Sequence, residues 1–121
     1  MSESEQPAIS GDQLLAVLAD LGIGDTRGVS VDDPIVGALC LAHQQLEEGE
    51  PGLAMNTLES ELAEPEGPQT LEMGAAAFVL RGRAHEAQGR AYNAKLDYEM
   101  ALNLNPTHPY ATEAVRRLNR G

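Results

Sequence analysis

Apolar side chains recur at three- and four-residue spacing along most of this chain, which is the pattern of amphipathic helices. The first such stretch follows a capping residue, Ser10, with Gln13 placed to complete a capping box. It ends at the Gly22-Ile23-Gly24 segment. We therefore predict a short N-terminal helix with an apolar stripe made of Leu14, Leu15, Val17, Leu18 and Leu21.

Proline before an apolar stretch and glycine after it mark the remaining helices, because proline suits the first helical turn and glycine the left-handed stop. Asp33-Pro34 is such a start, and Gly49 and Gly89 are such stops. A connection follows at residues 64–69, and Thr70 is the expected cap of the next helix. No segment alternates with period two, so we predict an all-α protein with further helices over residues 34–48, 51–62, 70–88, 91–104 and 107–120.

An internal repeat becomes visible when the chain is shifted against itself by forty residues. Small residues then meet small ones and large apolar residues meet large ones, as in the pairs Gly49 with Gly89, Ala54 with Ala94 and Leu58 with Tyr98. Each copy reads as helix, glycine turn, helix. A repeat of this kind is typical of solenoids built from helical hairpins.

The second copy carries a recognisable spacing of small and aromatic residues: Phe78, Gly82, Gly89, Ala94, Tyr98, Ala101 and the closing Pro106. With this spacing it resembles a tetratricopeptide repeat. Two positions depart from the family pattern, because Arg81 stands where leucine is usual and His85 where tyrosine is usual. The first copy, residues 34–65, is a degenerate version with about six extra residues before the second.

The resemblance implies a short α-solenoid of two tetratricopeptide-like hairpins, residues 34–64 and 70–105, closed by a C-terminal capping helix over 107–120. Together these elements make one domain, residues 34–121. Residues 10–33 then form an extra N-terminal helix and loop, and the polar, acidic residues 1–9 are expected to be disordered.

In the tetratricopeptide family the first helix of each hairpin lines a concave groove that binds a peptide or a helix. The resemblance therefore implies a non-enzymatic protein–protein interaction module, an adaptor or scaffold. Two alternatives stay open: a small secretion-type chaperone for an amphipathic client helix, and a structural protein that self-assembles by stacking its repeats. The groove residues that the resemblance implies are Val36, Leu39, His43, Ala76, Val79, Arg83, Glu86, Tyr110, Glu113 and Arg117.

Charge narrows the range of partners. The chain of 121 residues has 19 acidic and 8 basic side chains, a net charge of −11, which disfavours nucleic acids and anionic membrane surfaces. No apolar run approaches the ~20 residues of a membrane span, and the acidic start does not resemble a signal peptide. The single cysteine, Cys40, suits a reducing compartment. We expect a cytoplasmic protein whose partner is a protein or peptide, with a homo-oligomer left open.

Candidate chemistry is sparse. The three histidines, His43, His85 and His108, have no cysteine or carboxylate at the spacing of a metal site. His85 is expected to be a packed core side chain, and Cys40 a small buried apolar one. We therefore predict no catalytic residues, no metal and no cofactor.

The N-terminal helix is too short to persist alone in water, so it must pack on something. One position is the flank of the first hairpin, which the sequence favours because an apolar surface would otherwise be exposed there. The other is a groove, its own or that of a second chain, since the stripe has the spacing of a groove-binding helix.

Overall fold

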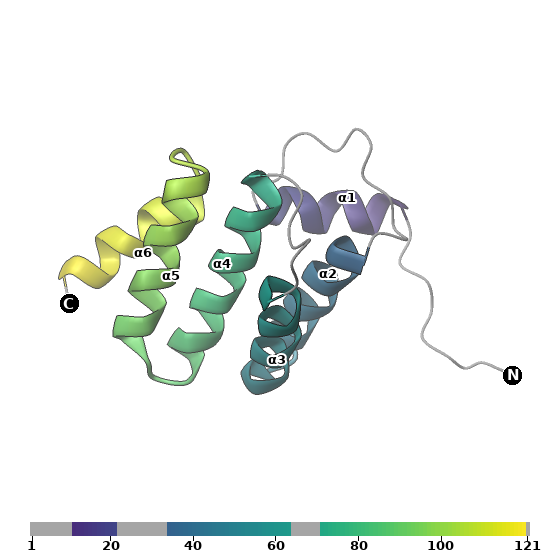
Figure 1. Ribbon diagram of the computed structural model, residues 1–121, viewed down its shortest axis with the longest axis horizontal. Helices are drawn as coiled ribbons and strands as arrows, with labels where there is room; N and C mark the ends of the chain where they lie inside the picture. The colour runs from purple at the N-terminus through teal and green to yellow at the C-terminus, as the bar shows by residue number, and fades with distance from the viewer. Residues whose placement is uncertain (1–10, 22–33, 64–70, 121) are drawn as a thin grey trace, which may run out of the picture.

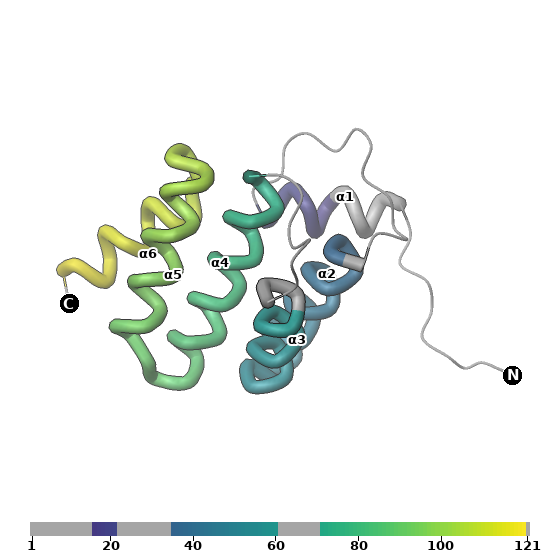
Figure 2. Tube along the Cα trace, in the orientation of Figure 1, coloured from purple at the N-terminus to yellow at the C-terminus, as the bar shows by residue number. Residues whose placement is uncertain are grey.

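The computed structural model of the protein describes residues 11–21, 34–63 and 71–120, with the side chains of residues 16–21, 35–60 and 71–120 (Figures 1 and 2). Within these ranges the chain is helical and has no strand, so the all-α prediction is confirmed. The helices are α1 (Gly11–Asp20), α2 (Pro34–Glu47), α3 (Pro51–Ala63), α4 (Leu71–Ala87), α5 (Ala91–Leu104) and α6 (Pro109–Arg120).

Some expectations concern residues outside the described ranges. They are the disordered start at 1–9, the caps Ser10, Asp33 and Thr70, and the connections 22–33 and 64–70.

Two tight turns join α2 to α3 and α4 to α5. Gly49 has φ 79° and Gly89 has φ 78°, the left-handed region that glycine occupies without strain. After each glycine the next amide donates back five residues, from Glu50 to the carbonyl of Gln45 and from Arg90 to that of His85, both at 2.8 Å. These are Schellman stops, and they confirm the predicted role of both glycines.

Helix α4 is the centre of the structure (Figure 1). It packs on α2 and α3 to one side and on α5 to the other, and α5 packs on α6. Its N-terminal half is rich in alanine and glycine and is buried from Met73 to Ala77. Small side chains let neighbouring helices approach α4 closely. It thus takes part in both buried clusters of the described residues, one reaching α1 and the other reaching α6.

Gly82 lies where α4 meets the ring of Tyr98 on α5. A Cβ at position 82 would come within 2.7 Å of the Tyr98 ring atom Cε1. Because that ring is fully buried, it has no room to move. The absence of a side chain at Gly82 is therefore what lets the aromatic ring fill the space between α4 and α5.

We expect Gly82→Leu to lower the free energy of unfolding by about 1–3 kcal/mol, because the added side chain overpacks against Tyr98. Urea unfolding followed by circular dichroism measures the change. Gly37→Leu is the matched control, since a Cβ at position 37 meets nothing within 4 Å. Equal midpoints for the two variants would show that Gly82 does not face the ring.

Candidate functional site

The N-terminal helix does not cap the flank of the first hairpin alone. Leu18 of α1 and Leu21, directly after that helix, are buried in one cluster with Val36 and Leu39 of α2 and with residues of α4, namely Met73, Ala76, Ala77 and Leu80. Figure 1 shows α1 running crosswise to α2 and α4. The C-terminal end of α1 also bonds to a residue just before α6, as described next. Helix α1 thus packs on the first hairpin, as the sequence favoured, and the buried face that it joins also takes residues from α4 and, through His108, from the start of α6.

His108 joins the end of α1 to the beginning of α6. Its side chain is 1% exposed, and its Nε2 atom lies 2.9 Å from the carbonyl oxygen of Leu21. The amide of Ala111 donates to Nδ1 at 3.3 Å, so that His108 also caps α6. Because Nδ1 accepts, the neutral ring carries its proton on Nε2 and donates it to Leu21. Both bonds are satisfied by this one tautomer.

Sequence reasoning did not identify His108 as a binding residue. The only local signal is its place before Pro109, which is the capping position of a helix that begins with proline. Nothing in the sequence indicates a partner eighty-seven residues earlier in the chain.

The four apolar residues expected in the groove are all buried. Val36, Leu39 and Ala76 share the cluster that contains Leu18 and Leu21. Val79 belongs instead to the second cluster, with Tyr98, Ala111 and Ala114. The apolar part of the expected groove is therefore in contact with other elements of the chain and is not an open surface.

Most of the expected polar residues lie together between α4 and α6. Glu86 receives two hydrogen bonds from the guanidinium of Arg117, at 2.6 and 3.0 Å, and one from the hydroxyl of Tyr98 at 2.7 Å. The bonds from Arg117 lower the pKa of Glu86 below its ordinary value. Burial raises the pKa of Tyr98, so this hydroxyl keeps its proton and remains the donor.

Arg83 and Tyr110 extend this polar group. The Arg83 guanidinium lies 5.5 Å from the centre of the Tyr110 ring and 3.5 Å from a carboxylate oxygen of Glu47 on α2. Tyr110 in turn lies 5.9 Å from the ring of Tyr98. The structure thus brings Arg83, Glu86, Tyr110 and Arg117 together.

The other two expected site residues have different surroundings. Glu113 pairs with Arg116 on its own helix at 2.8 Å. His43 is a half-buried side chain of α2.

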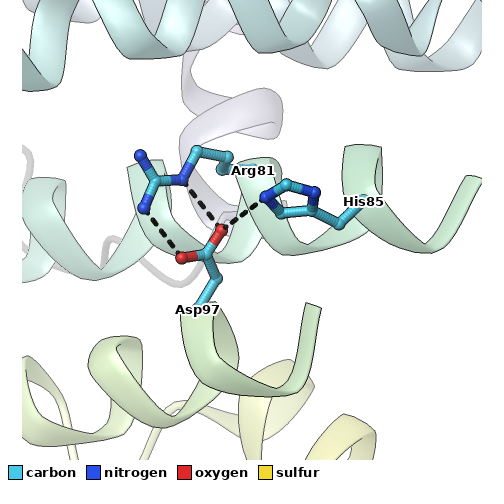
Figure 3. Close-up of polar contacts among 3 residues, drawn as sticks. All are labelled: Arg81, His85 and Asp97. Carbon is cyan, nitrogen blue, oxygen red and sulfur yellow. Dashed lines mark hydrogen bonds and ion pairs between the residues drawn. The ribbon is translucent and has the colours of Figure 1, made fainter. Parts of the chain in front are cut away.

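A second polar cluster contains the two residues that depart from the tetratricopeptide spacing, Arg81 and His85 (Figure 3). Asp97 of α5, which is 5% exposed, accepts hydrogen bonds from Nε and Nη2 of Arg81 at 2.8 and 2.9 Å. His85 Nε2 lies 3.6 Å from the same carboxylate. Arg81 also lies over the ring of Phe78. The polar side chains of Arg81 and His85 thus face one carboxylate on the neighbouring helix.

We expect stability to fall as the pH drops below about 6.5, in part because of His85. Burial lowers the pKa of His85 from its ordinary 6.5, although Asp97 opposes this shift. The unfolded chain then binds more protons than the folded one, and stability decreases toward acid pH. Unfolding midpoints between pH 7.5 and 5 measure this, above the range in which Glu86 titrates. His85→Gln should flatten the profile, whereas an unchanged profile would rule out this cause.

Other chemistry finds little support among the described residues. Cys40 is half-buried rather than fully buried, and burial raises the pKa of its thiol, which disfavours the reactive thiolate. In the part of the chain that the structure covers, no group of three or more His, Cys, Asp or Glu residues could hold a metal ion. None of the helices described above is long and apolar enough to cross a membrane.

Comparison with known proteins gives no relative: no family model matches the chain, and neither the curated proteins nor the solved structures contain a match. The tetratricopeptide resemblance rests on the residues of this chain.

Proposed function

We propose that α2 to α6 form a short array of the tetratricopeptide type, and that the protein is a non-enzymatic interaction module, an adaptor or scaffold. In this proposal it binds an amphipathic helix of another protein on the face to which α2, α4 and the start of α6 contribute. One observation carries the proposal: Leu18 of the chain's own α1, and Leu21 directly after that helix, are buried in one cluster with Val36, Leu39 and Ala76.

The chemistry of this face suits a helical ligand. Two apolar anchors three residues apart lie on one side of a helix, which is how helices dock in grooves. Full burial of a leucine is worth about 1.5–3 kcal/mol, so two anchors give a substantial part of a micromolar affinity. The helix that this face accommodates in the chain itself, α1, carries acidic but no basic residues.

Helix α1 occupies the proposed binding face, so it competes with any partner. A helix tethered by the twelve residues 22–33 competes with any external helix at an effective concentration in the millimolar range. The intact chain is then a weak binder, and a partner has to displace α1.

The direct test uses a fluorescent peptide that copies residues 10–24 and a full chain carrying Leu18→Asp and Leu21→Asp. In this chain α1 cannot bury its anchors, so the face is free for the peptide. We expect saturable binding at micromolar concentrations, and binding at least about tenfold weaker to the unaltered chain, because its own helix competes. Fluorescence anisotropy measures both.

The control is a peptide with the same two leucines replaced by aspartate, which should not saturate. Circular dichroism verifies that the variant chain remains helical. If it does not, the unaltered chain is titrated to millimolar peptide instead. Binding that is absent, or that is the same for both peptides, would show that the proposed function is wrong.

Self-assembly remains a second candidate because of a stripe on α5. Tyr92, Leu96 and Met100 are spaced by one turn and are 73%, 43% and 44% exposed. Two copies of the chain could bury this stripe against each other. Sedimentation velocity over a range of concentrations distinguishes a self-associating chain from a monomer.

A further inference from the structure

The C-terminal end of α1 is completed by a side chain from elsewhere in the fold. The last carbonyl groups of a helix lack partners within the helix and need hydrogen-bond donors from other groups. The amide of Leu21 bonds back to the carbonyls of Val17 and Leu18, at 3.0 and 3.2 Å. The carbonyl of Leu21 itself is bonded to Nε2 of His108 at 2.9 Å.

The last turn of α1 offers no substitute for this donor. It contains no basic residue, and Asp20 places a negative charge at the end where the helix dipole is also negative. A donor from outside the helix is therefore worth more here than at an end with its own lysine or arginine. His108 can act as this donor because its other nitrogen is engaged by the amide of Ala111.

We propose that the face occupied by α1 binds the C-terminal end of a helix. His108 recognises that end by donating a hydrogen bond to the last carbonyl. The inference rests on the proposed function and narrows the class of partner. The ligand is an amphipathic helix with two large apolar residues three positions apart, and it ends at the second of them. Its direction is set, because only the C-terminal end offers a carbonyl without a partner.

Recognition of this kind excludes a helix that continues past the second anchor. In a longer helix the corresponding carbonyl is bonded to an amide four residues later and is covered by the next turn. His108 would then face an occupied acceptor, and its own buried donor would be left without a partner, which is unfavourable.

The test is a cycle of two chains and two peptides. Both chains carry Leu18→Asp and Leu21→Asp, and one also carries His108→Asn. Asparagine is a good helix cap and can still accept from Ala111, but it is too short to reach Leu21. The peptides copy residues 10–24. In one of them glycolic acid replaces Gly22, which turns the carbonyl of residue 21 into an ester and a weaker acceptor.

We expect the ester peptide to bind the chain with His108 about two- to tenfold more weakly than the amide peptide, which is the range of one net hydrogen bond. On the His108→Asn chain the two peptides should bind equally, because the donor is gone. His108→Gln should restore part of the difference, since its amide nitrogen reaches about as far as Nε2.

If the ratio of the two peptides' affinities is the same on both chains, the role of His108 is wrong. The proposed function still stands in that case if binding requires the leucines at positions 18 and 21 of the peptide. Loss of all leucine-dependent binding would overturn the proposed function as well. If the chain with Leu18→Asp and Leu21→Asp does not stay helical, the binding measurement is replaced by amide hydrogen exchange on the chain that keeps both leucines. In that chain, His108→Asn should speed the exchange of the Leu21 amide but not that of the Ala101 amide. Unchanged exchange of the Leu21 amide would contradict the proposal.

Discussion

Replacing Tyr98 with alanine is expected to lower the free energy of unfolding by about 3–5 kcal/mol, as large-to-small substitutions of buried aromatic residues do. The ring is fully buried, packs over Gly82 of α4 and lies 5.9 Å from the ring of Tyr110 on α6. Removing it leaves a cavity that the small alanines around it cannot fill. It also removes the hydroxyl that donates to Glu86. Urea unfolding of the purified chain measures the loss.

Tyr98→Phe separates the two contributions. It keeps the ring and removes only the hydroxyl, so it should cost about 1–2 kcal/mol, because Glu86 retains both bonds from Arg117. If Tyr98→Ala lowers the free energy of unfolding no more than Tyr98→Phe does, the ring does not fill the space between α4 and α5. The packing of α5 on α4 described above would then be wrong.

The second large effect is expected at Asp97. Asp97→Ala leaves Arg81 without its bidentate partner and should cost about 2–3 kcal/mol. This is less than the about 3–5 kcal/mol of a fully buried pair, because the Arg81 side chain is 25% exposed and water can reach it. The same unfolding measurement records the loss.

The double variant Arg81→Leu with Asp97→Leu is the control for this pair. Replacing both partners by apolar side chains removes the unpaired charge, so the double variant should be more stable than Asp97→Ala. A double variant that is less stable than the single one would mean that the guanidinium has a role beyond its bond to Asp97.

The helices were predictable from the sequence because local signals agree with one another. Pro34, Pro51 and Pro109 begin helices in the structure, and Gly49 and Gly89 end them in the left-handed conformation. These signals act over a few residues, and tertiary contacts do not override them.

The site was less predictable because its geometry depends on distant residues. The sequence marked Arg81 and His85 as unusual, but it did not show that Asp97, one helix later, accepts a pair of bonds from Arg81. It predicted an apolar stripe on the N-terminal helix and two possible positions for it, the flank of the first hairpin and a groove. The choice between them depends on where buried partners are available. The contact between the Leu21 carbonyl and His108 depends on the packing of the helices that lie between them in the chain.

The central claim is that a helix binds where α1 now lies, and the most direct measurement is where a bound helix attaches. The peptide copying residues 10–24, with a photoreactive leucine analogue in place of Leu18, is bound to the chain that carries Leu18→Asp and Leu21→Asp and is then irradiated. Mass spectrometry should find the adducts on α2 and α4, at residues 36–39 and 73–77. Adducts on the exposed stripe of α5, at Tyr92, Leu96 and Met100, would contradict the account.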